Sequence, residues 1–191
     1  MLRSERGLTA VELLVTIAIL AILIGIAAPS LTQFVAKWRV SNALNALTGS
    51  FRLARTEAIA RSRPVILCRV SSNTSTSCQT STGTNGLASG WIVFVDLDSD
   101  KTFSTGDELL LRQGALAGIW DIQPTTTSLG TFKFNPNGVS TVAMGLNVTA
   151  AGFEDISVPP WARKAICIAK TGRIRYVADS SDCSGPAGSG G

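Results

Sequence analysis

An apolar segment near the N-terminus constrains this chain more than any other feature of its sequence. From Leu13 to Ala28, only Thr16 and Gly25 interrupt a series of Leu, Ile, Val and Ala. Counted from Leu8, the segment spans about 21 residues, or roughly 31 Å as an α-helix, which matches the hydrocarbon thickness of a membrane. We therefore expect residues 8–29 to form a membrane-spanning helix.

One carboxylate, Glu12, lies at the front of this segment. A charged side chain deep in a bilayer costs about 2.5–3.5 kcal/mol or more, so such a residue usually has a partner. Arg3 and Arg6 precede the segment, and this arrangement keeps the N-terminal tip cytoplasmic. The alternative is an ordinary secretory signal peptide cut near residues 26–28. The early carboxylate and the helical periodicity beyond the segment argue against that alternative.

Apolar residues continue at helical spacing behind Pro29, until Pro64 ends the pattern. We predict one helix of about 50 residues, bent at Gly25 and Pro29, whose part from 30 to 63 is amphipathic. The apolar positions of that part are Phe34, Val35, Trp38, Ala43, Leu44, Leu47, Phe51, Ala54, Ala58 and Ile59.

After Pro64 the pattern changes to short apolar or alternating runs between Gly, Asn and Pro turns. This pattern predicts antiparallel sheets packed against the helix, an α+β head over residues 64–183. Residues 184–191 read as a flexible tail. The candidate strands are VILCRV (65–70), GWIVFVDL (90–97), ELLLRQ (108–113), WDIQ (120–123), GTFKFN (130–135), EDISV (154–158), KAICIA (164–169) and RIRYV (173–177).

Four cysteines lie downstream of the membrane-targeting segment, which favours disulfides in an oxidising compartment such as a periplasm. Three connectivities are possible. Cys68–Cys78 and Cys167–Cys183 close the shortest loops, so we expect those pairs. The first pair would hold the polar stretch over residues 71–90, which reads as an exposed loop.

The arginine–glycine pair at residues 6–7, followed by LTAVELLVTIAILAILIGIAAPS, resembles the class III signal of type IV pilins and type II secretion pseudopilins. In that family a prepilin peptidase cuts after the glycine, here Gly7, and the new N-terminus, here Leu8, is methylated. Residues 1–7 would then be the leader peptide. Leu8 departs from the family's usual Phe, whereas Pro29 matches its helix-bending proline. Glu12 falls fifth after the cut, where the family pairs a glutamate with a neighbouring subunit's terminus, which implies a role in assembly.

Runs along the head resemble the FimT/GspH group of minor pilins and pseudopilins. They are TEAIARSRPVILC, GWIVFVDLDSDKTFSTGDELLL, FKFNPNGV and AICIAKTGRIRYV. The resemblance implies the type IV pilin fold. It also implies other major and minor pilins, the prepilin peptidase and the inner membrane as partners. The head would face the periplasm before the subunit enters a pilus at the cell surface.

Basic residues concentrate in WARKAICIAKTGRIRY, which contains no acidic residue. Its two strands would be joined by a tight turn at Thr171–Gly172. Alternation places Arg173 and Arg175 on one face, about 6.6 Å apart between Cα atoms. That spacing is close to two phosphate steps of about 3.4 Å along one nucleic-acid strand, and Lys170 adds a third contact across the turn.

The four letters GRIR match the G-R-x-R motif of DNA-binding FimT pilins of natural transformation. The match implies that Gly172, Arg173 and Arg175 contact double-stranded DNA without reading its sequence. Asp179 and Asp182 are close enough in sequence to neutralise part of the charge. The alternatives are a solvated, arginine-rich strand face on a structural minor pilin that primes pilus assembly, or on a type II secretion pseudopilin.

No pattern in the chain predicts catalysis or a cofactor. The sequence has no His, and it lacks a G-x-S-x-G elbow and a P-loop, so we do not expect an enzyme. DLDSDKTFSTGDE begins with aspartates at alternate positions, as a calcium loop would. However, Lys101 occupies the position that requires Gly, and Asp107 replaces the bidentate Glu. We therefore expect a hairpin connection there, and no metal site.

Overall fold

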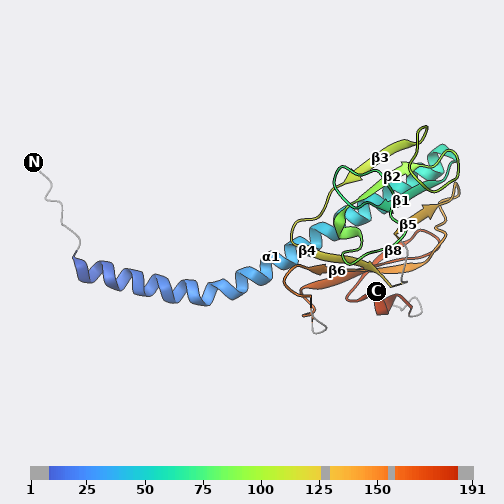
Figure 1. Cartoon of the computed structure of the whole chain (residues 1–191). Coiled ribbons are helices and arrows are strands. Elements are labelled where there is room, and N and C mark those ends of the chain that lie inside the picture. The colour runs from blue at the N-terminus through green and yellow to red at the C-terminus, as the bar shows by residue number, and fades with distance from the viewer. Residues whose placement is uncertain (1–8, 126–129, 155–157, 185–191) are drawn as a thin grey trace, which may run out of the picture. The chain divides into compact units, whose positions relative to one another are not determined.

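The computed structural model describes residues 9–125, 130–154 and 158–184 (Figure 1). It consists of one long helix and two four-stranded antiparallel sheets, so the predicted α+β class is confirmed. The chain divides into two units, residues 1–35 and 36–191. The predicted leader 1–7, the processing position Leu8 and residues 185–191 of the predicted tail lie outside the described residues.

The helix α1 (Ala10–Arg61) begins with a capping box. The backbone N–H and the hydroxyl of Thr9 each donate to Glu12 Oε2 at 3.0 Å, and Glu12 N–H donates to Thr9 Oγ1 at 3.3 Å. This reciprocal pairing satisfies backbone donors that the first turn of any helix leaves open. The apolar stretch that follows is long and apolar enough to cross a membrane, and none of it is buried.

The other end of α1 shows why the helix stops before Pro64. Ser62 takes a left-handed conformation, with φ 52°. Its N–H donates to the Ile59 carbonyl, and Arg63 N–H donates to the Ala58 carbonyl, both at 3.3 Å. This pair of bonds is a Schellman motif, which usually has glycine at the left-handed position. The predicted end of the helix at residue 63 is therefore within two residues of the observed one.

The second half of α1 buries one stripe of side chains in the head. Phe51 lies at its centre and makes edge contacts with Phe132 and Phe134. Trp38 and Ile59 fit the helical spacing but are exposed, because they lie beside the stripe rather than on it. The buried stripe consists of Ala36, Val40, Ala43, Leu44, Leu47, Phe51, Ala54 and Ala58.

The first sheet has the order β3 (Glu108–Gln113), β2 (Trp91–Val95), β1 (Val65–Arg69), β5 (Thr131–Phe134). All four strands match candidate strands of the sequence. The face toward α1 includes Trp91, whose indole N–H donates to Ser50 Oγ on the helix at 2.9 Å. The opposite face carries a second apolar cluster. The buried members of this cluster are Ile66, Cys68, Val70, Ile92 and Phe94.

The second sheet has the order β4 (Ile119–Pro124), β6 (Met144–Ala150), β7 (Arg163–Ile168), β8 (Ile174–Val177). The sequence prediction missed β6, although this strand pairs with both β4 and β7. Its Gly and Asn at alternate positions look like turn residues, whereas the residues between them point into the core. Of the candidate strand EDISV, residues 155–157 lie outside the described residues, and the two flanking residues belong to no strand.

Both expected disulfides, Cys68–Cys78 and Cys167–Cys183, are present. The first ties β1 to the long polar loop that contains the short helix η1 (Leu87–Ser89). The second ties β7 to the short helix η2 (Ser180–Ser184), which follows β8. The main core takes residues from α1 and from the inner faces of both sheets.

Candidate nucleic-acid interface

The basic stretch identified in the sequence forms the hairpin β7–β8. Ile168 pairs with Ile174, and Cys167 pairs with Arg175. Ala169 N–H donates to the Arg173 carbonyl at 2.9 Å, which closes a loop of residues 170–172. The hairpin prediction is therefore confirmed, with a three-residue loop in place of a two-residue turn.

Gly172 occupies the last position of this loop for two physical reasons. Its φ of 77° is left-handed, a conformation that glycine adopts without steric cost. A Cβ at this position would lie 2.7 Å from Arg55 Cδ and 2.9 Å from the Gly138 carbonyl oxygen. Gly172 is buried, so its observed role is to let the hairpin approach the helix closely.

The side chains of β8 alternate as the sequence predicts. Ile174 packs against the main core. The hydroxyl of Tyr176 forms a hydrogen bond with Thr48 Oγ1 on α1 at 3.2 Å, so this ring faces the helix. Arg175 lies on the other face, where its Nη2 donates to the Asp182 carbonyl at 2.8 Å. One donor of Arg175 is therefore already used by the segment that follows β8.

Arg173 lines a cleft of about 300 Å³, which we call the basic cleft. Arg52 and Arg55 of α1 form its other charged wall. Of the four residues predicted to contact DNA, Gly172 and Arg173 line this cleft. Arg175 and Lys170 lie outside it, so the structure does not bring all four together. Lys170 is exposed in the hairpin loop, where its carbonyl accepts from Ser140 N–H at 2.7 Å. The residues that line the cleft are Arg52, Arg55, Thr56, Gly172, Arg173 and Ile174.

The guanidinium of Arg55 is only partly satisfied. Its Nη1 reaches the Gly172 carbonyl at 3.5 Å, a long contact for a hydrogen bond. Its Nε is buried and has no hydrogen-bond partner among the described residues. Buried donors in native proteins are normally paired, so Arg55 Nε is an exception to that rule. Within the described part of the chain, no carboxylate forms an ion pair with Arg52, Arg55 or Arg173.

The sequence prediction missed the two helix arginines of this cleft. The available signal was their spacing, because residues three apart lie on the same face of a helix. Arg52 and Arg55 flank the buried Ala54 on the apolar stripe. However, 117 positions separate Arg55 from Gly172. Nothing local in either segment indicates that the two segments meet.

The acidic residues near the hairpin act on its outer arginines rather than on the basic cleft. A backbone hydrogen bond from Ser181, with the charge of Arg163, lowers the pKa of Asp179 below its usual range. Asp179 therefore stays ionised and lies 3.9 Å from Arg163. Asp182 offers its carbonyl to Arg175. The neutralisation that the sequence suggested thus concerns Arg163, whereas Arg175 meets only a neutral carbonyl group.

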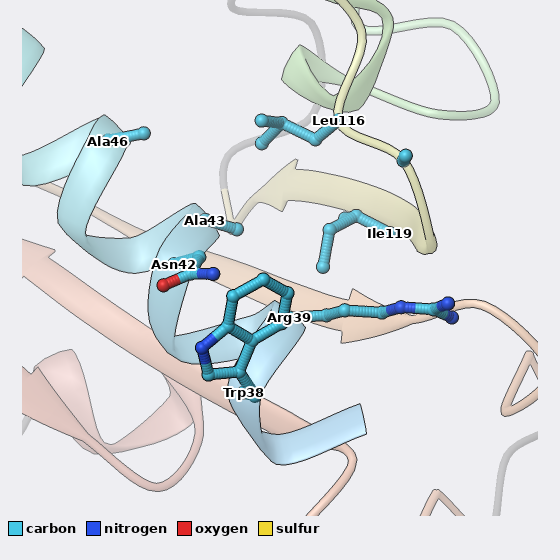
Figure 2. A pocket seen from close by; sticks show the side chains of 8 residues that line it. Trp38, Arg39, Asn42, Ala43, Ala46, Leu116 and Ile119 are labelled. Carbon is cyan, nitrogen blue, oxygen red and sulfur yellow. The ribbon is translucent and has the colours of Figure 1, made fainter. Parts of the chain in front are cut away.

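A second cavity, of about 230 Å³, lies between α1 and the start of β4. Figure 2 shows Trp38, Arg39, Asn42 and Ala43 of the helix on one side, with Leu116 and Ile119 across from them. The walls are mostly apolar, and Arg39 is the one charged residue that lines it. The lining offers no carboxylate or nucleophile, so we assign no chemistry to it.

Comparisons with known proteins agree with this architecture. The family model described as type II transport protein GspH matches residues 43–172. The pilin-like protein PilA1 of Thermus thermophilus is 28% identical over 179 residues, which cover 90% of this chain and 98% of that protein. The crystal structure of the type IV minor pilin FimU of Pseudomonas aeruginosa aligns with a TM-score of 0.52 at 14% identity. That alignment covers 74% of this chain and 90% of FimU.

The family match covers well over half of the chain, and the FimU alignment shows the same pilin-like fold of a long helix with an antiparallel head. The chain therefore belongs to the GspH family, with a pilin-like fold and an N-terminal helix that is long and apolar enough to cross a membrane.

Proposed function

We propose that this minor pilin binds extracellular double-stranded DNA, without sequence specificity, for uptake in natural transformation. The observation that carries the proposal is the basic cleft, in which Arg173 of the GRIR motif lies with Arg52 and Arg55. Three guanidinium groups line one cleft, and no carboxylate is among the lining residues. The proposal extends the G-R-x-R resemblance from the hairpin to the helix.

The chemistry of the cleft suits a phosphate. Guanidinium groups bind phosphate oxygens through paired N–H donors, and Arg52 and Arg173 are the exposed arginines of the cleft. Arg175 and Lys170 lie outside the cleft, on the same hairpin, and would contact further phosphates along the strand. Contacts to phosphates alone position a duplex without reading its bases, so binding should be insensitive to sequence.

The test is a salt titration of DNA binding by the full-length protein in detergent micelles, with a fluorescent duplex and anisotropy as the readout. Each phosphate contact contributes about 0.9 to the slope of log affinity against log salt concentration. The double variant Arg52→Gln/Arg173→Gln should therefore lower the magnitude of that slope by about 1.8. The matched control is Lys101→Gln/Arg112→Gln, which removes the same charge from exposed positions on the side of the first sheet.

Two results would contradict the proposal. One is an unchanged slope in the cleft variant, and the other is an equal loss in the control, which would mean that only net charge matters. In cells, the cleft variant should reduce transformation while pili still form. If transformation is normal and pili are lost, the subunit primes pilus assembly. If protein secretion fails instead, the subunit is a type II secretion pseudopilin.

We also propose the family's processing and assembly route for this chain. A prepilin peptidase would cut after Gly7 and leave a methylated Leu8, with the head in the periplasm.

Glu12 would then exchange its contact with Thr9 for the α-amino group of a neighbouring subunit. Glu12→Gln keeps an acceptor for the capping box but removes the charge, so it should block assembly and leave the head folded. Mass spectrometry of the mature N-terminus and recovery in sheared pili test both steps. Normal incorporation of the Gln variant would contradict the role of Glu12.

A further inference from the structure

A second charged cluster lies on the first sheet, in the connection between β2 and β3. Asp96, Asp98 and Asp107 each place a carboxylate oxygen within 4.8 Å of the other two. Asp98 is exposed and Asp107 is partly exposed, but Asp96 directly follows β2 and is fully buried. Three carboxylates this close repel one another unless a cation lies between them.

The side chain of Asp96 provides an independent indication of a ligand. Its Oδ1 accepts the backbone N–H of Ser99 at 2.8 Å. Its Oδ2 is buried and has no hydrogen-bond partner among the described residues. Lys133 acts on Asp96 electrostatically, but no ion pair between them appears in the described structure. A buried carboxylate oxygen without a partner is costly, and a bound cation would remove that cost.

We propose that this connection binds one Ca²⁺ ion through Asp96 Oδ2 and the carboxylates of Asp98 and Asp107. Calcium takes six to eight oxygen ligands at about 2.3–2.6 Å, so two oxygens on one ion lie at most about 5 Å apart. The observed separation of up to 4.8 Å meets that limit without movement of the backbone. Backbone carbonyls and water complete the coordination. Magnesium fits less well, because it requires a tighter octahedral arrangement.

The structure also answers the two objections that the sequence raised. Lys101 occupies the position where a calcium loop has Gly, but its backbone adopts the left-handed conformation that glycine supplies there, with φ 67°. Its side chain is exposed. Asp107 need not act as a bidentate ligand, because it is already oriented by the backbone N–H groups of Leu97 and Ser104, each at 2.9 Å. The site therefore differs from an EF-hand, although its first two aspartates have the EF-hand spacing.

The test uses the full-length protein in detergent, freed of metal by a chelator and then titrated with CaCl₂. Isothermal titration calorimetry measures binding, and thermal unfolding followed by circular dichroism measures stabilisation. Ca²⁺ should bind with one site per chain and raise the Tm saturably. The expected affinity lies in the range of extracellular calcium modules, about 10⁻⁴–10⁻³ M. MgCl₂ at the same concentration should give a much smaller shift in Tm.

Asp98→Asn should weaken Ca²⁺ binding about tenfold or more, because it removes one of three anionic ligands. Its exposed position makes it the variant least prone to misfolding, and Asp107→Asn provides a second one. Glu154→Gln, an exposed carboxylate remote in the sequence, makes the same charge change and should leave binding unaltered. Absence of both binding heat and a Tm shift in the wild type would overturn the proposal. An unchanged Ca²⁺ response in both Asp variants would overturn it too.

Discussion

The two sheets of the head differ in what covers the face turned away from α1. On the first sheet this face is apolar. Phe94 is buried there and makes an edge contact, at 5.4 Å between ring centroids, with Phe103 of the acidic connection, the segment 96–107 between β2 and β3. On the second sheet the same face is polar, with Asp121, Thr149 and Arg163 on adjacent strands. Arg163 Nε donates to Thr149 Oγ1 at 3.2 Å. One outer layer therefore depends on hydrophobic burial, and the other depends on hydrogen bonds and ionisation.

The largest expected effect tests the apolar layer. Phe94→Ala should lower the free energy of unfolding by about 3–5 kcal/mol, because it opens a cavity in a fully buried cluster. Leu109→Ala is the matched control, since Leu109 pairs with Phe94 across β2 and β3 but is 38% exposed. Urea unfolding of the purified protein measures both variants. Equal losses of unfolding free energy in Phe94→Ala and Leu109→Ala would show that burial in the outer cluster adds little stability beyond that of a partly exposed contact.

A smaller effect separates the two disulfides. Removing either pair, by Cys68→Ser/Cys78→Ser or by Cys167→Ser/Cys183→Ser, should cost about 3 kcal/mol through the entropy of the unfolded chain. The local consequences should differ. The loop after β1 keeps the hydrogen bonds of Arg69 Nε to the Gly86 carbonyl and to Ser89 Oγ.

The segment η2, by contrast, is held by Cys183, by the bond from Ser180 N–H to Asn147 Oδ1 and by the bond from Arg175 Nη2 to the Asp182 carbonyl. Hydrogen exchange should therefore show loss of protection across η2 in the second double variant, and retained protection near Gly86 in the first. If protection near Gly86 in the first variant fell as much as protection across η2 in the second, the two disulfides would not differ in their local effect.

The smallest effect concerns the pH dependence of the polar layer. Burial raises the pKa of Asp121 above its usual range, although its hydrogen bond with Thr149 and the charge of Arg163 oppose the shift. A carboxyl whose pKa is higher in the folded state binds its proton more tightly there. Its contribution to the free energy of unfolding therefore falls as pH rises from about 3.9, the unfolded value, through the folded pKa.

Asp121→Asn should remove that decline, so the variant should gain stability relative to the wild type as pH rises toward neutrality. Urea unfolding between about pH 3.5 and 7 measures the difference. Parallel pH profiles for the two proteins would show that Asp121 has the same pKa in both states.

Sequence reasoning succeeded where a feature depends on local spacing. The amphipathic half of the helix, the hairpin and most strands follow from periodicity, and the short cysteine loops indicated both disulfides. It failed at β6, because Gly145 and Asn147 on its polar face resemble turn residues. That face is closed by η2, which is contributed by a distant part of the chain.

The candidate DNA-binding site likewise depends on contacts between distant parts of the chain, which local sequence patterns do not reveal. The hairpin arginines were recognised from their motif, but only the fold brings Arg173 into a cleft with Arg52 and Arg55. The aspartate spacing between β2 and β3 resembles a calcium loop, but the sequence predicted a hairpin connection there and no metal site. The buried, unpaired oxygen of Asp96 depends on packing that the sequence does not state. Local patterns thus identified segments, and long-range contacts decided which side chains share a site.

The missing side chain of Gly172 allows shape and charge to be varied separately. Any residue larger than glycine at this position would crowd the cleft, because its Cβ would lie 2.7 Å from Arg55 Cδ and displace that side chain. The chain would keep every positive charge, but the added carbon would also strain the left-handed loop against the Gly138 carbonyl oxygen, 2.9 Å away. A substitution here therefore changes the geometry of the cleft and of the hairpin loop together, at constant charge.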